Sequence, residues 1–239
     1  MTGVAHKTFP SFFPEMTAAP AFNRSIVESL VRDSLLRQVG THIPSRPAPT
    51  LLVNSSARHM HVSPESLEIL FGPGAQLTVH KWLYQEGQFA SEQTVTLIGP
   101  RRRVIPNLRI LGPCRSLTQI ELALTDAVQL GMEIPVRMSG DIDGTPGGYV
   151  MGPKGMLEMP NGIIRAARHV HMSPSDAQFY GVKHLDKITL KVTSHGCTTR
   201  FDDLIARVDP AFKLEVHIDT DEANACDLER ASKVELFKA

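Results

Sequence analysis

The stretch ARHMHVSP at residues 57–64 returns as ARHVHMSP at residues 167–174. Each copy holds two histidines separated by one residue, with Ala-Arg before them and Ser-Pro after them. Histidines at positions i and i+2 of a β-strand point to the same face of a sheet, so the two imidazoles of each pair can bind one metal ion. The duplication therefore predicts a chain of two related halves, each of which supplies part of one joint site.

The segments around the two histidine pairs have the same order. A β-type segment leads into each pair, and SPESLEILFG (63–72) and SPSDAQFYG (173–181) follow as short helices with a Ser-Pro start and a Gly end. From residue 50 on, short β-type segments alternate with Gly and Pro turns, a pattern typical of sandwiches and barrels. We predict a mainly β fold of two small β-barrels, related by the internal repeat and capped by short helices.

The composition indicates an ordinary globular protein. The chain has 239 residues, 42% of them hydrophobic, which is enough for one or two domains with a buried core. Lysine plus arginine and aspartate plus glutamate both number 25, so the net charge gives no reason to expect a nucleic acid or an anionic membrane as partner. The 3 cysteines form neither a disulfide framework nor a paired zinc motif. This cysteine pattern predicts a reducing cytosol. The sequence has no run of about 18 apolar residues, and prolines at positions 10, 14 and 20 interrupt the N-terminal stretch, so we expect neither a membrane span nor export.

Residues 1–49 differ from the rest of the chain. NRSIVESLVRDSLLRQVG at 23–40 predicts an amphipathic helix, with a capping box of Ser25 and Glu28 and a glycine stop. The prolines that follow are typical of a stiff, extended linker. Such a helix either packs on its own domain or lays its apolar face into the groove of a partner.

Each histidine pair needs a third ligand from elsewhere in the chain. Glu121 in SLTQIELALTDA and His217 in KLEVHIDTDEANA lie among apolar neighbours, where an ionisable group without a partner is costly. Three protein ligands with an open position are typical of a catalytic rather than a structural zinc. The alternative is that the pairs are ordinary strand histidines, but their duplication with the same flanks favours two metal ions. The remaining histidines are expected at the surface or in packing roles: His6, His42, His80, His184 and His195.

A Gly-Pro turn in RILGPCRSLTQIE, residues 109–121, delivers Arg115 just before the segment of Glu121. A guanidinium fixed near a metal at Glu121 could bind an oxyanion through two parallel hydrogen bonds. The alternative is a surface arginine in a loop. The residues alone leave both interpretations open.

Four segments, in this order, resemble the PduL-type phosphate propanoyltransferase family, the phosphotransacylase of bacterial microcompartments: NSSARHMHVS, LRILGPCRSLTQIELALTDAVQLG, GIIRAARHVHMS and DTDEANA. The resemblance covers about residues 50–239. It implies an acyltransferase that converts an acyl-CoA, such as propionyl-CoA or acetyl-CoA, and phosphate into an acyl phosphate and CoA. It also implies two divalent metal ions, zinc in most members, between two small β-barrels.

The resemblance assigns roles to residues at matching positions. It implies that Arg115 is the catalytic arginine and binds phosphate. One metal would be held by His59, His61 and Glu121. The other metal would be held by His169, His171 and His217. Coenzyme A contacts are implied for Ser56, Lys81, Arg109 and Asn224.

The resemblance also divides the chain into three parts. Residues 1–47 would be an N-terminal extension made of the helix and its Pro-rich linker. Residues 58–166 would be the central barrel, and residues 48–57 with 167–239 the second barrel. The first strand would thus join the C-terminal barrel, so that the barrels exchange segments.

The N-terminal extension resembles an encapsulation peptide, which favours docking over packing on its own domain. Residues 1–46 would bind shell proteins and bring the enzyme into a microcompartment in the bacterial cytoplasm. The preferred acyl group, a homo-oligomeric state and the pathway, such as propanediol degradation, are left open. Two other functions also stay open: a dinuclear zinc hydrolase that cleaves acyl-CoA without phosphate, and a non-enzymatic metal-binding module associated with the shell.

Overall fold

The computed structural model describes residues 28, 31, 34 and 48–238. The predicted N-terminal helix and its linker lie outside the described residues, except that Glu28, Val31 and Ser34 have helical backbone. The chain divides into two compact units, Met1–Arg46 and Pro47–Ala239. Within the described part of the chain, no helix is long and apolar enough to cross a membrane.

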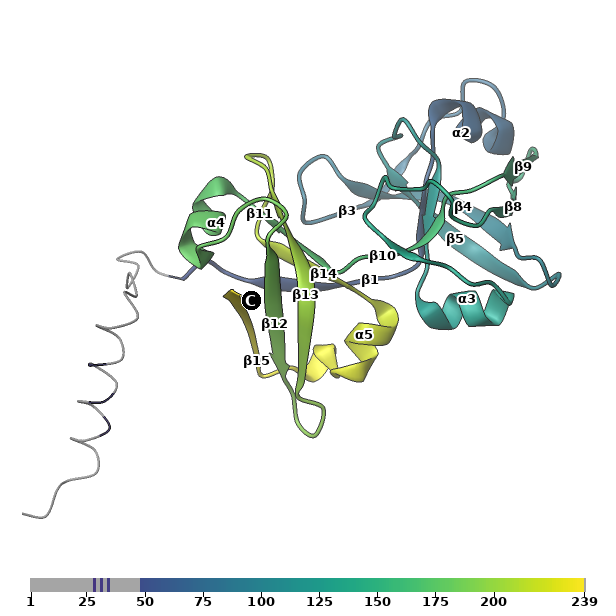
Figure 1. Ribbon diagram of the computed structural model, residues 1–239. Helices are drawn as coiled ribbons and strands as arrows, with labels where there is room; N and C mark the ends of the chain where they lie inside the picture. The colour runs from purple at the N-terminus through teal and green to yellow at the C-terminus, as the bar shows by residue number, and fades with distance from the viewer. Residues whose placement is uncertain (1–27, 29–30, 32–33, 35–47, 239) are drawn as a thin grey trace, which may run out of the picture. The chain divides into compact units, whose positions relative to one another are not determined.

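Two curved sheets form the framework of residues 48–238 (Figure 1). The first sheet has the strand order β7-β10-β6-β2-β5-β4-β8-β9, with β3 paired to β4. Its strands are β2 (His59–His61), β3 (Val79–Trp82), β4 (Phe89–Ile98), β5 (Val104–Gly112), β6 (Gln119–Glu121), β7 (Val136–Arg137), β8 (Gly148–Met151), β9 (Met156–Met159) and β10 (Ile163–Ala166).

The second sheet has the strand order β1-β14-β11-β13-β12-β15. Its strands are β1 (Leu52–Ser56), β11 (His169–Met172), β12 (Lys187–Thr193), β13 (Thr199–Val208), β14 (Glu215–Asp219) and β15 (Lys233–Lys238). Each sheet contains one of the two His-x-His strands, β2 or β11, near its middle. This architecture confirms the predicted fold class, a mainly β protein built from two related barrel-like halves.

Short helices follow the sheet strands at matching places in the two halves. They are α2 (Pro64–Phe71), α3 (Leu124–Leu130), α4 (Pro174–Tyr180) and α5 (Thr220–Ala225), with a 3-10 turn η1 (Leu228–Arg230) after α5. The Ser-Pro after each histidine pair begins a helix, as predicted. Ser63 accepts a hydrogen bond from the N–H of Ser66 at 3.2 Å, and Ser173 from the N–H of Asp176 at 3.2 Å. Proline follows each cap at the position where its missing N–H costs nothing.

The strand before each histidine pair belongs to the sheet of the other half. β1, which leads into the first pair, lies parallel to β14 with Asn54 opposite His217. β10, which leads into the second pair, lies parallel to β6 with Ile164 opposite Glu121. The exchange is therefore reciprocal, and Figure 1 shows β1 and β10 running between the two sheets. The predicted domain boundaries stay a prediction, because the residues from Pro47 on form one compact unit.

Each sheet encloses its own apolar core. Met60 lies between the two histidines of the first pair and Val170 between those of the second, and both have an exposed fraction of 0%. The two residues belong to separate apolar clusters, one for each sheet. Because neighbouring residues of a strand face opposite sides of the sheet, a core residue in the middle turns both histidines of its pair to the other face.

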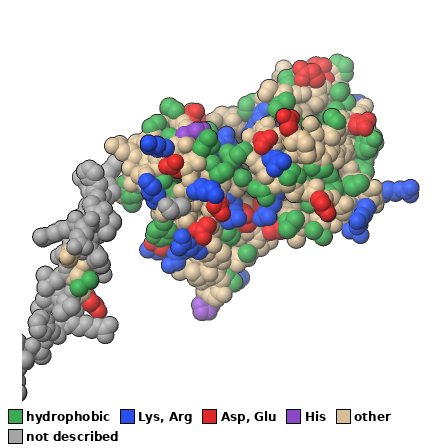
Figure 2. All heavy atoms as spheres, in the orientation of Figure 1, with side chains coloured by type: hydrophobic (Ala, Val, Ile, Leu, Met, Phe, Trp, Pro, Cys, Tyr) green, Lys and Arg blue, Asp and Glu red, His purple; other side chains and the backbone are tan. Residues whose placement is uncertain are grey.

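Charged groups join the two halves along the exchanged strands. Arg165 on β10 donates hydrogen bonds to Asp219 at 2.7 Å and to Glu222 at 2.9 Å, at the start of α5. The backbone N–H of Thr125, in α3 of the other half, donates to Asp221 at 2.9 Å. On the face shown in Figure 2, basic and acidic side chains are intermixed where the halves meet. Asp219 and Glu222 are buried, so their charges depend on the arginine for compensation.

Replacing Arg165 with methionine is expected to lower the free energy of unfolding by about 3 kcal/mol, because two buried carboxylates lose this partner. The matched control is Lys187→Met, because the Lys187–Asp203 pair is exposed on both sides, at 66% and 69%. The control should cost less than about 1 kcal/mol. Urea unfolding of the two variants in the presence of a chelator measures the difference. Equal losses would contradict the role given to Arg165.

Candidate active site

The structure brings the six predicted metal ligands together in two groups of three. In each group the ligand atoms lie within 4.8 Å of one another. The first group is His59, His61 and Glu121, and the second is His169, His171 and His217. The grouping follows from strand register, because β2 pairs with β6 and β11 with β14 in the same antiparallel way. His59 stands opposite Glu121, and His169 stands opposite His217.

The first triad has its ligand atoms close together. Nε2 of His59 lies 3.1 Å from Nε2 of His61 and 3.6 Å from a carboxylate oxygen of Glu121. Burial, together with the charges of His59 and Arg115, lowers the pKa of His61 to about 2. Burial alone would raise the pKa of Glu121, but the neighbouring histidines outweigh this and lower it. The triad therefore combines a neutral imidazole with an ionised carboxylate.

The second triad consists of three imidazoles in mutual contact. The rings of His169 and His217 are stacked, with centroids 4.9 Å apart and an interplanar angle of 2°. The ring of His171 lies 4.8 Å from each of them and stacks on Phe212 at 4.3 Å. Burial lowers the pKa of His169 to about 4 and that of His171 to about 2. Both side chains are thus neutral near pH 7, which is the form that binds a metal.

The alanine before each pair orients the first histidine. The carbonyl oxygen of Ala57 lies 2.8 Å from Nδ1 of His59, and that of Ala167 lies 2.9 Å from Nδ1 of His169. Because a carbonyl oxygen only accepts, Nδ1 carries the proton in both rings and the lone pair of Nε2 faces the triad.

The arginine before each pair ties its strand to a helix start. Arg58 pairs with Asp126 in the first turn of α3 at 2.7 Å, and Arg168 pairs with Glu222 in the first turn of α5 at 3.0 Å. Each of these helices directly follows the strand that carries the third residue of the triad, β6 or β14. In both halves, the alanine thus orients the first histidine of the pair, and the arginine fixes the strand relative to the helix that follows the third member of the triad.

The triads contain buried nitrogens that have no hydrogen-bond partner within residues 48–238. They are Nδ1 of His61, both ring nitrogens of His171 and Nε2 of His217. A buried polar atom without a partner costs on the order of 1–3 kcal/mol, so a protein retains one only where something else satisfies it. Imidazole and carboxylate groups are the usual ligands of divalent first-row metals. The residues present therefore fit one such ion in each triad.

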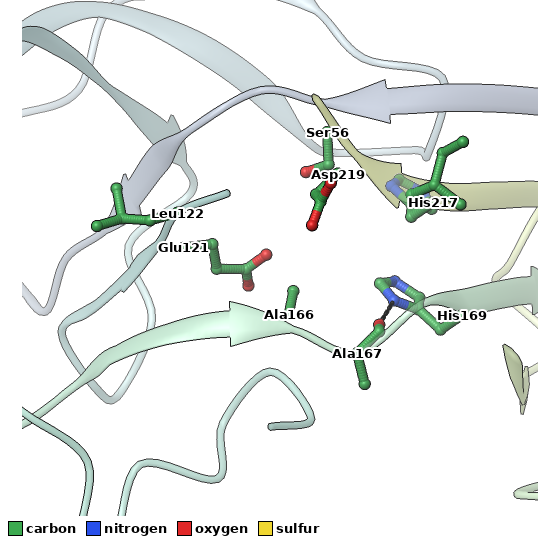
Figure 3. A pocket seen from close by; sticks show the side chains of 9 residues that line it. Ser56, Glu121, Leu122, Ala166, Ala167, His169, His217 and Asp219 are labelled. Carbon is green, nitrogen blue, oxygen red and sulfur yellow. Dashed lines mark hydrogen bonds between the residues drawn. The ribbon is translucent and has the colours of Figure 1, made fainter. Parts of the chain in front are cut away.

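A small cavity of about 20 Å³ lies between the triads (Figure 3). Glu121 from the first sheet and His169 and His217 from the second all face it, together with Ser56 at the end of β1 and Asp219. The volume suits about one water molecule or one small polar group. Residues of both halves of the repeat thus line a single cavity.

Arg115 lies in the loop after β5 and is placed by the backbone. Its N–H donates to the carbonyl oxygen of Val62 at 2.9 Å, and its Nη1 donates to the hydroxyl of Ser139 at 3.2 Å. Partial desolvation lowers the pKa of the guanidinium, and the charge of Glu121 opposes this shift. Within residues 48–238 no acid forms an ion pair with Arg115. Its remaining donors are therefore free to bind an anion from outside.

The four residues implied as coenzyme A contacts lie in different surroundings. Only Ser56 lines the cavity between the triads. Lys81 is exposed on β3, and Asn224 is exposed on α5. Arg109 on β5 donates to the backbone carbonyls of Ser91 at 2.9 Å and Glu92 at 3.1 Å. The structure does not bring these three residues to the cavity.

Glu215 belongs to the site although the sequence did not single it out. The residue has an exposed fraction of 1%, and its carboxylate accepts hydrogen bonds from Asn54 at 3.2 Å and Gln85 at 2.7 Å. One of its oxygens lies 3.1 Å from Nε2 of His217 without the alignment of a hydrogen bond. The alternation in KLEVHID, which puts residues 215 and 217 on one face, was the available signal.

Gln119 occupies the matching place in the first half. It stands opposite His61 in the register of β2 and β6, just as Glu215 stands opposite His171 in that of β11 and β14. Its Nε2 donates to Glu121 at 2.8 Å and to Ser139 at 2.9 Å. A polar residue two positions before the third member of each triad thus supports that triad in both halves.

The chain is similar to a family of enzymes over most of its length. Residues 52–229 match the family described as phosphate propanoyltransferase. A protein named phosphate propanoyltransferase from Planctopirus limnophila is 50% identical over 232 residues, which cover 94% of this chain and 95% of that protein. A protein of the same name from Thermotoga maritima is 50% identical over 77% of this chain and 87% of its own length. A third, from Salmonella typhimurium, is 45% identical over 80% of this chain and 89% of its own length.

In metal-free protein, the free energy of unfolding is expected to fall as the pH decreases from about 6.5 to about 4. His61, His169 and His171 bind protons in the unfolded chain over this range but stay largely neutral in the folded chain, because burial lowers their pKa. Unfolding therefore takes up protons, and each histidine contributes up to about 1.4 kcal/mol per pH unit. Urea unfolding in chelator over this pH range measures the slope. His171→Asn should flatten it, and a stability independent of pH would contradict the neutral imidazoles.

Proposed function

Because this chain belongs to the phosphate propanoyltransferase family, we propose that it transfers a propanoyl group from coenzyme A to inorganic phosphate, releasing propanoyl phosphate and CoA. The two triads on either side of one small cavity, at the junction of the repeats, carry the proposal. Acetyl-CoA presents the same thioester with one methylene fewer and is proposed as a second substrate. The reverse transfer uses the same groups.

We assign one divalent ion, Zn²⁺, to each triad. The first ion would be held by His59, His61 and Glu121, and the second by His169, His171 and His217. The unpartnered ring nitrogens and the neutral state of the buried imidazoles support this assignment. When bound, such ions supply Lewis acidity that neutralises phosphate oxygens and polarises a carbonyl.

In the proposed mechanism Arg115 holds the phosphate. Its guanidinium has donors that no acid of residues 48–238 occupies, and it can bind two phosphate oxygens in a fork. A third phosphate oxygen then attacks the thioester carbonyl carbon. The new C–O bond forms as the C–S bond breaks, and CoA leaves as a thiolate with the bonding electrons.

In this mechanism the side chains around the cavity position the reacting groups and are not required to transfer protons. The thiolate needs no strong acid to leave, which agrees with imidazoles whose lowered pKa values make them poor proton donors near pH 7. A phosphate held by Arg115 would stand in a fixed position beside the thioester carbonyl, so attack by phosphate is favoured over attack by free water. No covalent bond between the enzyme and the acyl group is required.

We propose that Ser56, Lys81, Arg109 and Asn224 contact coenzyme A. Ser56 is closest to the chemistry, since it lines the cavity. Lys81 and Arg109 lie on the neighbouring strands β3 and β5 that flank β4, and their positive charges suit the phosphates of CoA. Asn224 on α5 is exposed and offers an amide to the solvent-facing part of the ligand.

We also propose that residues 1–46 dock the enzyme to shell proteins of a microcompartment in the bacterial cytoplasm. The amphipathic pattern of the segment, followed by a proline-rich linker, supports this assignment. The alignment with the Planctopirus limnophila protein covers 94% of the chain and so extends into this segment, whereas the Thermotoga maritima alignment covers 77%. The catalytic part and the docking part would then be separable.

Release of CoA from propanoyl-CoA by zinc-loaded protein is expected only when phosphate is present. Glu121→Gln and His217→Ala should each lower the metal content and reduce kcat roughly 100-fold or more, because a loss of several kcal/mol of charge stabilisation is expected. His80→Ala is the matched control, since His80 is exposed and pairs with Glu92 at 2.9 Å on the surface. Equal release without phosphate would indicate a hydrolase. No release from metal-loaded protein would indicate a non-enzymatic module.

Deleting residues 1–46 is expected to leave phosphate-dependent CoA release unchanged and to abolish co-purification with shell proteins. The deletion ends before β1, so the exchanged strand and both triads stay complete. Activity assays and pull-down from co-expressed shell proteins measure the two effects. A loss of activity would show that the segment is part of the catalytic fold.

A further inference from the structure

Arg207 is a second guanidinium beside the triads, and neither the repeat nor the family resemblance assigned it a role. It lies near the end of β13, which runs parallel to β11, and it stands directly beside His171 in the register of the two strands. Paired residues of neighbouring strands face the same side of a sheet, so Arg207 lies on the face that carries the second triad. The side chain is partly buried.

Aromatic contacts hold this guanidinium in place. Its central carbon lies 5.8 Å from the centroid of the Phe212 ring. The same ring stacks on His171 at 4.3 Å. Phe212 thus links the arginine to the second triad, and a cation over an aromatic face is stabilised without using its hydrogen-bond donors.

Arg207 has no acidic partner within residues 48–238. Three other arginines of the same part of the chain do: Arg58 pairs with Asp126, and Arg165 and Arg168 pair with Glu222. The guanidinium of Arg207 forms no ion pair and no hydrogen bond in the described part of the chain. A desolvated cation without a counter-charge is costly, so this position calls for an anion from outside the chain.

The charges of Arg207 and Arg115 act on each other and on the same triad residue, His171. The charge of Arg207 lowers the pKa of Arg115, and both arginines lower the pKa of His171. Glu121, across the cavity in the first triad, acts on the guanidinium of Arg207 in turn. The two unpaired arginines, one from each half of the repeat, thus flank the region of the triads. Their mutual repulsion is relieved when a dianion lies between them.

We propose that Arg207 binds phosphoryl oxygens of the substrate together with Arg115, so that each half of the repeat contributes one guanidinium to a single anion site. This inference rests on the proposed transfer to phosphate. Phosphoryl oxygens occur both in inorganic phosphate and in the diphosphate of coenzyme A. The position beside His171 and the electrostatic link to Arg115 favour inorganic phosphate.

The test compares Arg207→Gln and Arg207→Lys with Arg200→Gln in zinc-loaded protein. Arg200 lies on the same strand, but its ion pair with Asp202 is exposed on both sides, at 66% and 58%. The KM for phosphate should rise roughly 10- to 100-fold in Arg207→Gln, the loss expected for a hydrogen bond to a charged group. Arg207→Lys should show a smaller rise, because lysine keeps the charge without the fork. The KM for propanoyl-CoA, the metal content and the control variant should stay unchanged.

A binding measurement separates this inference from the proposed function. Calorimetric titration of inorganic phosphate into zinc-loaded protein without CoA should show tight binding for wild type and Arg200→Gln, and a matching 10- to 100-fold loss for Arg207→Gln. If wild type binds phosphate through Arg207 but shows no phosphate-dependent CoA release, the proposed transfer fails while the anion site stands.

Three results would overturn the role of Arg207. A rise in the KM for propanoyl-CoA with an unchanged KM for phosphate would place the arginine on the CoA diphosphate. A loss of zinc in Arg207→Gln would show a structural role in the second triad. If Arg207→Gln fails to fold, an unchanged phosphate KM in folded Arg207→Lys would equally contradict the proposal.

Discussion

The reciprocal exchange of β1 and β10 is the constraint on which the site depends. β14 lies between β11 of its own half and β1 of the other, and β6 lies between β2 of its own half and β10 of the other. The third member of each triad, His217 or Glu121, therefore stands on a strand that is held from both halves. Because the exchange occurs twice, separation of the halves would remove one neighbouring strand from both β6 and β14. The candidate active site and the interface of the repeats therefore depend on the same strand pairs.

Most positions of the repeated motif have an identifiable physical role. The alanine carbonyl sets the proton of the first imidazole, and the arginine ties the strand to an acid at a helix start. The residue between the histidines is buried in the apolar core, which turns both imidazoles to the opposite face. Serine and proline then begin a helix. Two half-sites that meet at one cavity need the same geometry, which explains why the motif occurs twice with its flanks intact.

The electrostatics of the site are incomplete without groups from outside the chain. Buried imidazoles stay neutral and some of their nitrogens have no partner in residues 48–238, while Arg115 and Arg207 have no acid. Elsewhere in the same residues the chain supplies acids where arginines need them, as with Arg165. Such local deficits are stable only where cations and an anion complete them. The divalent metals proposed for the triads and the phosphate proposed to lie between the arginines would supply these charges.

The sequence by itself determined the parts of this protein that depend on local patterns. The i, i+2 spacing put each histidine pair on one face, Ser-Pro and glycine marked the helix ends, and apolar surroundings pointed to Glu121 and His217. The tertiary structure decided what depends on long-range pairing. Gln85 donates a hydrogen bond to Glu215, 130 residues further along the chain, and no local sequence pattern at either residue predicts this contact. That Arg207 has no acidic partner within residues 48–238 likewise follows only from the complete arrangement of the strands. Local patterns specify which way a side chain points, but the global packing of strands decides what it meets.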